Sequence, residues 1–223
     1  MVTVAQGPER RVGGLTRERI INVAIELLDA DGETGLTFRA LAARLETGHG
    51  ALQWHVANKS GLLKAATAVA VARAVDDVDP DSSPREAIHA IALGVFDAID
   101  AHPWLGGQLT RPPWQSTMLR IFERLGRQVR AFGPPTAAQF TSTSTLLIYM
   151  IGAGGQEATT SRAPAALGDR QHLLDILAQQ WEGLDPEEYT FTRSVAGRLR
   201  AHDDRAEFLA GLDLILNGME TSR

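Results

Sequence analysis

Residues 49–56 carry side chains whose types and spacing suit contact with the edges of DNA bases. Only Leu52 and Val56, four residues apart, clearly point inward in this segment. Its other side presents short or hydrogen-bonding side chains, at His49, Gly50, Ala51, Gln53 and His55. A helix of this kind can lie in the major groove with its N-terminal residues at base edges. The pattern therefore predicts a DNA-recognition helix that starts near His49.

Neighbouring helices must position this segment. One apolar face of a short preceding helix is formed at i, i+3, i+4 and i+7 by Phe38, Leu41, Ala42 and Leu45. Thr37 is its predicted N-cap, and residues 46–48 are a tight turn. An earlier helix is capped by Thr16 and ends at Gly32, and Asn58 caps a long helix from Lys59 to about Val75. The sequence therefore predicts a helix-turn-helix within residues 37–59.

Composition sets limits on the rest. The chain has 223 residues, 44% of them hydrophobic, and no cysteine, which fits a reducing cytoplasm. Its longest apolar run is far short of the ~20 residues that span a membrane, so no membrane partner is expected. The net charge of −5 is unusual for DNA binding, but residues 1–60 hold seven basic and seven acidic side chains. The excess of acidic side chains therefore lies in residues 61–223.

The remainder is predicted to be helical, which makes the fold class all-α. Helices are expected at 84–101, 114–132, 136–160, 169–181 and 204–220, with a broken segment at 102–114. The domains are then an arm at 1–14, a DNA-binding domain at 15–60 and a C-terminal helical domain at 61–223. Arg10 and Arg11 in the arm could reach a minor groove or belong to a solvated tail.

The C-terminal domain holds candidates for a ligand pocket. Aromatic and polar-tipped side chains gather around the broken segment, at His102, Trp104, Arg111, Trp114 and Tyr149. They could line a mostly apolar cavity with a few polar anchors. Structural aromatic residues are an equally good interpretation.

Signatures of catalysis are missing from the sequence. It has no strand-bound nucleophile motif, no phosphate-binding loop and no metal-ligand spacing. Residues 152–155 are rich in glycine but follow no strand, and Asp203 with Asp204 is typical of a helix cap. No enzyme activity, cofactor or metal is predicted.

The sequence LTFRALAARL, followed by GALQWHVANKSGLL, resembles the helix-turn-helix of the TetR family of bacterial repressors. The distinctive part is Trp54-His55-Val56 with Asn58-Lys59, and the resemblance covers residues 15–75. It departs at two positions. Glu46 stands where the family usually has glycine in the turn, and Gln53 replaces an aromatic residue. Because glutamine can bond adenine bidentately, operator preference cannot be taken from relatives.

The resemblance extends to roles for particular residues. It implies that Lys59 contacts a phosphate, and we expect Trp54 and His55 to hold the phosphate backbone as well. Bases or sugars are expected to face Phe38, Arg39, His49, Gly50, Ala51 and Gln53. The stretch at 110–112 is similar to one in tetracycline-responsive members, but the place of their magnesium-binding histidine falls on Gly107. A magnesium-tetracycline site is therefore not expected.

These observations predict a cytoplasmic homodimer that binds double-stranded operator DNA and is released from a palindromic operator by a small lipophilic effector. The resemblance implies that helices 136–160 and 204–220 form a four-helix subunit interface, although both could instead be intrachain core. The alternative function is a helical small-molecule-binding or enzyme-like protein whose hairpin is only structural. Activation in place of repression also stays open.

Overall fold

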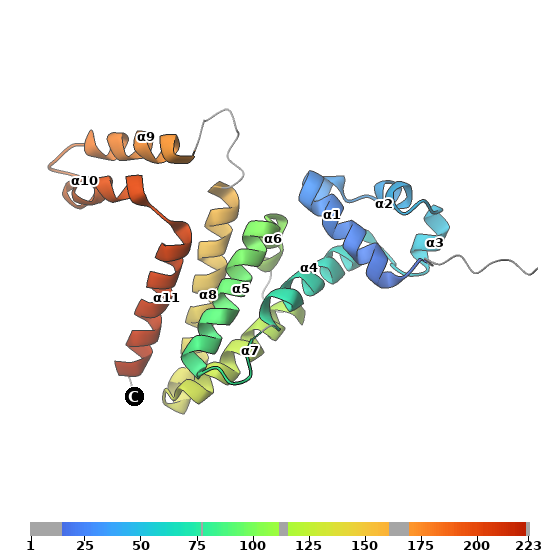
Figure 1. The fold of residues 1–223 in the computed structure, drawn as a ribbon, viewed down its shortest axis with the longest axis horizontal. Coiled ribbons are helices and arrows are strands. Elements are labelled where there is room, and N and C mark those ends of the chain that lie inside the picture. Colours follow the sequence, from blue (N-terminus) through green and yellow to red (C-terminus); the bar gives the residue numbers. More distant parts are fainter. Residues whose placement is uncertain (1–14, 77, 112–115, 161–169, 222–223) are drawn as a thin grey trace, which may run out of the picture. The chain divides into compact units, whose positions relative to one another are not determined.

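The computed structural model describes residues 15–76, 78–111, 116–160 and 170–221. All secondary structure in these ranges is helical, as the sequence predicts. The chain divides into two compact units, residues 1–69 and 70–223 (Figure 1). Arg10, Arg11 and Trp114 lie outside the described residues.

The first unit contains α1, α2, α3 and most of α4. Their bounds are Arg17–Gly35, Phe38–Arg44, His49–Gln53 and Lys59–Val75. Helix α4 continues into the second unit, because the boundary falls between residues 69 and 70.

The second unit contains seven further α-helices and one 3₁₀ helix in the described ranges. The bounds are α5 Pro84–Ala101, α6 Trp104–Leu109, α7 Ser116–Phe132, α8 Thr136–Thr160, α9 Arg170–Glu182, α10 Thr190–Val195, η2 Ala196–Ala201 and α11 Asp204–Thr221. The segment predicted as broken thus contains the short helix α6.

Side-chain caps fix the helix starts in the first unit. The Thr16 hydroxyl accepts a hydrogen bond from Arg19 N at 3.1 Å, and the Thr37 hydroxyl accepts one from Ala40 N at 3.1 Å. Asn58 Oδ1 accepts from Gly61 N at 2.7 Å at the start of α4. Each contact satisfies a backbone N–H that has no partner inside its helix. All three predicted caps are confirmed.

The predicted end of the first helix at Gly32 corresponds to a break. Gly32 has φ 65° and ψ −164°, which is far from helical geometry, and one short turn follows before Gly35. Glycine has no Cβ, so it adopts this conformation at little steric cost. The core of this unit comes from the apolar faces of all four helices, and includes Ile20, Leu28, Leu36, Leu41, Leu52 and Leu62, each at most 1% exposed.

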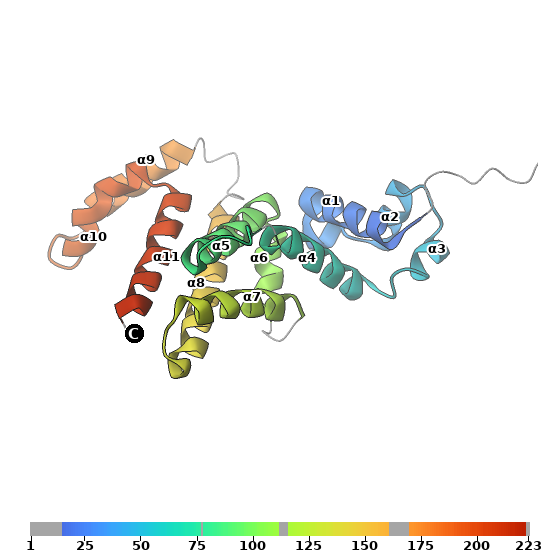
Figure 2. The same cartoon turned by 60° about the horizontal axis from the view of Figure 1, so that its bottom comes forward.

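In the second unit, α5, α7 and α8 pack against one another, and α11 packs on α8 and α5 (Figures 1 and 2). Helix α9 packs mainly on η2 and α10. The predicted cap at Ser83 is a full capping box, because Ser83 and Glu86 bond each other's backbone N–H groups. None of the described helices has the length and apolar content needed to cross a membrane.

The last turn of α4 is held tightly inside the second unit. A Cβ added at Gly94 in α5 would lie 2.0 Å from the carbonyl oxygen of Ala74, so the two helices approach more closely than any side chain there would allow. Just beyond α4, Asp76 accepts hydrogen bonds from Arg120 and Arg124 of α7. Both α5 and α7 therefore fix this end of α4.

Candidate functional site

Helix α3 presents its polar residues to solvent. Leu52 is fully buried and Val56 is 8% exposed, and these two side chains anchor the segment. The four residues predicted to face bases on this helix, His49, Gly50, Ala51 and Gln53, are all exposed. Gln53 Nε2 lies 3.3 Å from His49 Nε2, one helical turn away. The two side chains with the richest hydrogen-bonding capacity therefore form one continuous polar surface.

The start of α2 lies beside the start of α3. The rings of Phe38 and His49 are 5.2 Å apart between centroids and tilted by 55°. Phe38 is half-buried and Arg39 is exposed. The structure thus brings the predicted base-facing residues of both helices to one region of the first unit.

The predicted phosphate contacts have different surroundings. Trp54 is 91% exposed and His55 is also exposed. Lys59 is half-buried, and its Nζ donates a hydrogen bond to the carbonyl oxygen of Glu33 at 2.5 Å. A lysine ammonium has three donors, so this bond leaves others for a phosphate. The role of Lys59 at a phosphate stays a prediction, and the structure adds a second role in tying α4 to the end of α1.

The turn between α2 and α3 has an unusual backbone conformation at Glu46, the residue that stands where the family usually has glycine. Glu46 has φ 50°, the only positive φ at a non-glycine position in the described residues. A side chain with a Cβ is disfavoured there, typically by about 1 kcal/mol or more.

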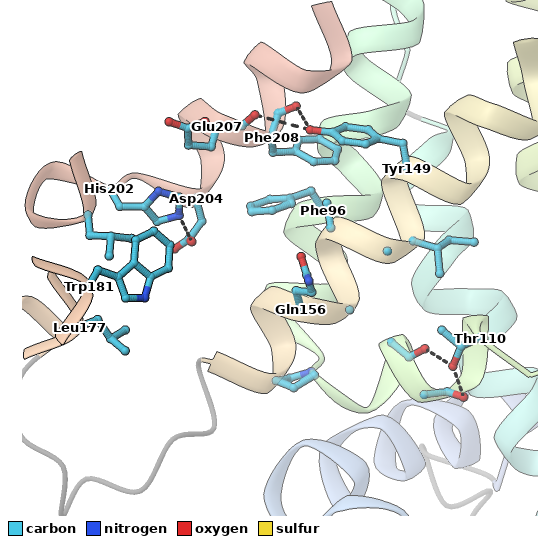
Figure 3. Close-up of a pocket in the computed structure, with 18 residues that line it drawn as sticks. Phe96, Thr110, Tyr149, Gln156, Leu177, Trp181, His202, Asp204, Glu207 and Phe208 are labelled. Carbon is cyan, nitrogen blue, oxygen red and sulfur yellow. Dashed lines mark hydrogen bonds and ion pairs between the residues drawn. The ribbon is translucent and has the colours of Figure 1, made fainter. Parts of the chain in front are cut away.

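A cavity of about 1340 Å³ lies in the second unit (Figure 3). Its walls come from α5, α6, α8, α9, η2 and α11. The lining includes Phe96, Gly106, Gly107, Thr110, Tyr149, Gly152, Ala153, Gly155, Gln156, Leu177, Trp181, His202, Asp204, Glu207 and Phe208. Large apolar surface and a few polar groups are typical of a small-molecule site.

Three stacked rings form one wall of the cavity (Figure 3). Phe208 lies 4.7 Å from Phe96 and 5.5 Å from Tyr149 between ring centroids, with interplanar angles of 28° and 11°. The Tyr149 hydroxyl donates to the carbonyl oxygen of Phe208 at 2.8 Å. Burial raises the pKa of Tyr149, and the charge of Glu207 raises it further. Tyr149 therefore stays a neutral donor that binds α8 to α11.

This wall depends on a glycine. A Cβ added at Gly211 would lie 2.1 Å from the Tyr149 hydroxyl oxygen. Only the absence of a side chain at residue 211 allows the tyrosine ring to lie against α11.

Acidic groups line the cavity at the start of α11. Asp204 is paired with Arg170 and with His202, whose Nε2 lies 2.9 Å from Asp204 Oδ1. Asp203 caps the helix, accepting from Ala206 N at 2.9 Å, which confirms the predicted capping role. The Glu207 carbonyl oxygen accepts a 3.5 Å hydrogen bond from the Tyr149 hydroxyl. Its half-exposed carboxylate lies 3.9 Å from Nη2 of Arg198, whose side chain is 82% exposed.

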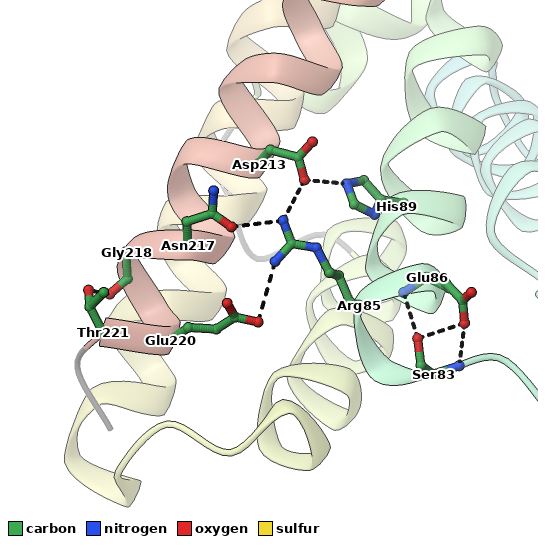
Figure 4. A network of polar contacts seen from close by, with 9 residues as sticks. All are labelled: Ser83, Arg85, Glu86, His89, Asp213, Asn217, Gly218, Glu220 and Thr221. Carbon is green, nitrogen blue, oxygen red and sulfur yellow. Dashed lines mark hydrogen bonds and ion pairs between the residues drawn. The ribbon is translucent and has the colours of Figure 1, made fainter.

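A second polar network holds α11 against α5 (Figure 4). Arg85 donates to Asp213 Oδ1 at 2.7 Å, to Asn217 Oδ1 at 2.9 Å and to Glu220 Oε1 at 3.4 Å. His89 Nε2 lies 3.0 Å from the same Asp213 oxygen. The hydrogen bond from Arg85 is the main cause that lowers the pKa of Asp213, and the charge of His89 contributes.

Of the predicted effector residues, Tyr149 lines the cavity. His102, Trp104 and Arg111 are not among its lining residues; Trp104 is 5% exposed, and its ring lies 6.0 Å from that of His102. Sequence reasoning missed Phe96, Trp181, His202 and Phe208. Phe208 belongs to an apolar stripe that the sequence revealed, but no local pattern indicates that residues from 96 to 208 meet around one space.

The family follows from comparison with known proteins. A family model described as the C-terminal domain of tetracycline repressor-like proteins matches residues 79–223, which is more than half of the chain. The chain belongs to the TetR family. The resemblance in residues 15–75 and the model match in 79–223 thus agree on one family of transcriptional regulators, which are not enzymes.

Individual relatives agree. The solved structure of the TetR transcriptional regulator SCO7222 from Streptomyces coelicolor is 51% identical, with a TM-score of 0.85 over 93% of this chain and 99% of that chain. The class C tetracycline repressor of Escherichia coli is 29% identical over 223 residues, 94% of this chain and 92% of its own. The TetR protein ActR of S. coelicolor, solved with actinorhodin, is 24% identical with a TM-score of 0.73 over 93% and 97%, and shares the fold.

Proposed function

We propose that this TetR protein is a homodimeric repressor that binds a palindromic operator through α3 and leaves it when a small lipophilic effector occupies the cavity. The observation that carries the proposal is the exposed polar side of α3. His49 and Gln53 lie at the surface, while Leu52 and Val56 are buried on the other side of the segment. A recognition helix must leave these side chains accessible to base edges, and the surface of α3 does so.

The contacts follow from the placement of the side chains. Gln53, His49 and Arg39 supply hydrogen bonds to base edges, where bidentate pairs discriminate between bases. Phe38, Gly50 and Ala51 allow close approach to bases or sugars. Trp54, His55 and Lys59 hold the phosphate backbone, which sets register and affinity without reading sequence.

Dimerisation is supported by apolar side chains left exposed on α8 and α11. Ile148 on α8 is 71% exposed, and Leu214 on α11 is 74% exposed, although the two helices pack together. A second copy would cover this surface in an isologous four-helix contact. Two copies of α3 about 34–36 Å apart would then match half-sites one turn of DNA apart.

The effector acts by preferring one state of the dimer. Occupation of the cavity must favour a conformation with lower operator affinity, and such coupling is typically worth about 1–3 kcal/mol.

A gel-shift titration tests the proposal, using the full-length protein and the DNA upstream of its own gene. We expect Gln53→Ala to reduce the preference for the operator over a site with one altered base pair by about 1–3 kcal/mol. Lys59→Ala should weaken binding to all sequences together. Lys59 also donates a hydrogen bond to the carbonyl oxygen of Glu33, so the substitution could destabilise the fold. The thermal unfolding of the Lys59→Ala variant is therefore measured in parallel, with Lys64→Ala as the control.

Two results would contradict the proposal. One is a protein that shifts no DNA and runs as a monomer at micromolar concentration, which would support the structural interpretation of the hairpin. The other is that both substitutions affect every sequence equally, in which case the assignment of roles within α3 is wrong.

A further inference from the structure

Part of the cavity surface is formed by glycines of α6 and α8. A Cβ added at Gly107 in α6, or at Gly152 or Gly155 in α8, would meet no atom within 4 Å. These glycines face open space rather than a neighbouring helix. A ligand can therefore lie directly on the backbone of both helices, and a thin ligand gains most from such a surface.

The other walls are aromatic. The stack of Phe96, Phe208 and Tyr149 comes from α5, α11 and α8, while Trp181 and Leu177 of α9 lie apart from it (Figure 3). Ring faces and edges of this kind bind flat aromatic molecules by offset stacking or edge-to-face contact. They also attract cations through the negative potential of the ring face.

The charged side chains that line the cavity are mainly acidic. Among its described lining residues, Asp204 and Glu207 are acidic and none is lysine or arginine. Asp204 is neutralised by Arg170 and bonded to His202. The Glu207 carboxylate has a longer contact, 3.9 Å to an exposed arginine, and its charge adds to the burial that raises the pKa of Tyr149.

We propose that the cavity binds a flat aromatic compound that carries a positive charge, and that Glu207 selects for that charge. This inference rests on the proposed function, in which the cavity is the effector site. An anion placed here would lie beside Asp204 and Glu207 and would find no lysine or arginine among the described lining residues, which is unfavourable in a partly apolar site. A cation keeps a counter-charge in Glu207 and gains attraction to the rings.

The test compares two dyes with the same xanthene ring and opposite charge. Rhodamine 123 is a cation, and fluorescein is an anion near neutral pH. Their binding to the full-length protein is measured by fluorescence anisotropy. Rhodamine 123 should bind at least about tenfold more tightly, since a difference of 1.4 kcal/mol is tenfold in affinity.

Substitution of Glu207 tests whether its carboxylate causes the preference for the cationic dye over the anionic one. Glu207→Gln should reduce the preference for the cation by about three- to tenfold and leave fluorescein bound no more weakly. Glu220→Gln is the matched control, because it makes the same change on the same helix at a residue that does not line the cavity. An equal loss in both variants would overturn the role of Glu207.

Filling the cavity locates the dye. Gly152→Leu and Gly107→Leu add side chains from different helices into the open space, and each should weaken rhodamine 123 binding at least about tenfold. Binding that survives both changes would place the dye elsewhere and overturn the inference. The inference would also be overturned if neither dye bound to the protein.

The outcomes separate this inference from the proposed function. Fluorescein bound as tightly as rhodamine 123, with binding lost in Gly152→Leu, would make the ligand class wrong and leave the cavity as the effector site. Failure of the wild-type protein to shift any operator DNA would instead overturn the proposed function, whatever the dyes do.

Discussion

Helix α3 and the cavity of the second unit are built in opposite ways. The surface of α3 comes from four exposed residues between 49 and 53, and it is anchored by two buried side chains, Leu52 within the helix and Val56 just after it. The cavity takes its walls from helices spread between residues 96 and 208, and no single helix supplies more than part of it. One site is local in sequence, while the other exists only through the packing of distant helices.

The difference determines how each site can fail. A surface held by two apolar anchors is lost when one anchor is removed, but it tolerates any change on its solvent side that keeps the backbone. A cavity between packed helices is sensitive to small volumes wherever two helices touch, because protein interiors are close-packed. The following substitutions sharpen this contrast or break it.

The largest effect is expected from Leu52→Ala, which removes the fully buried anchor of α3. Loss of a buried leucine side chain typically costs about 2–5 kcal/mol. Calorimetry of the full-length protein should show a lower unfolding temperature for the first unit, together with loss of operator binding. Trp54→Ala is the control, because this side chain is 91% exposed and should change stability by no more than about 0.5 kcal/mol. If Leu52→Ala cost as little as its control, α3 would be anchored by other contacts.

Gly211→Ala should have the next largest effect, on the second unit. The added Cβ would overlap the Tyr149 hydroxyl, which must move and give up its bond to Phe208. Overpacking of this kind typically costs about 1–3 kcal/mol. Chemical denaturation measures the cost, with Gly218→Ala on the same helix as control, since a Cβ there meets nothing within 4 Å and favours the helix. Equal stability of the two variants would show that the tyrosine wall adapts freely.

Glu46→Gly should stabilise the first unit. Glycine at φ 50° relieves strain of about 1 kcal/mol or more, while its greater freedom in the unfolded chain offsets part of this gain. We expect a net increase of about 0.5–1 kcal/mol in the free energy of unfolding, measured by thermal denaturation. A decrease would mean that the glutamate side chain makes a stabilising contact that outweighs the backbone strain.

The smallest effect concerns the network between α5 and α11, and it depends on pH. Since Arg85 and His89 lower the pKa of Asp213 in the folded protein, the carboxylate stabilises the fold above its ordinary pKa of 3.8 and loses this effect as pH falls through the lower folded value. Asp213→Asn should therefore cost less than about 1 kcal/mol at neutral pH, because the carboxylate is half-exposed and screened.

Denaturation series from about pH 7 to about pH 3 should show the difference between the Asp213→Asn variant and the wild type narrowing towards acid pH. A difference that stays constant over this range would show that the charge of Asp213 does not contribute to stability.

The contrast also explains what the sequence could predict. Helix starts at Thr16, Thr37, Asn58 and Ser83 depend on a cap and the residues just after it, so they could be predicted locally. The polar side of α3 was predictable for the same reason, because period and side-chain type are enough. The family resemblance identified Glu46 as a residue at a turn position usually held by glycine, and the backbone there has a positive φ.

The cavity lay beyond such reasoning. Tyr149 was predicted as a lining residue, but the same reasoning also chose Trp104, which is 5% exposed and does not line the cavity. Aromatic residues near a break in the helices look alike in sequence, whether they end in the core or at a pocket. Phe96, Trp181 and His202 come together through helix packing, and each has an ordinary local context.

Ala74 packs closely on Gly94, and Asp76 accepts hydrogen bonds from two arginines of α7. The end of α4 is therefore tightly packed against its neighbours. This end cannot slide alone along its neighbours. A rearrangement that starts at the cavity and keeps these contacts carries α4, α5 and α7 together or bends α4 before residue 70. A conformational change at the cavity would then reach the first unit through the movement of whole helices rather than through the loss of contacts around α4.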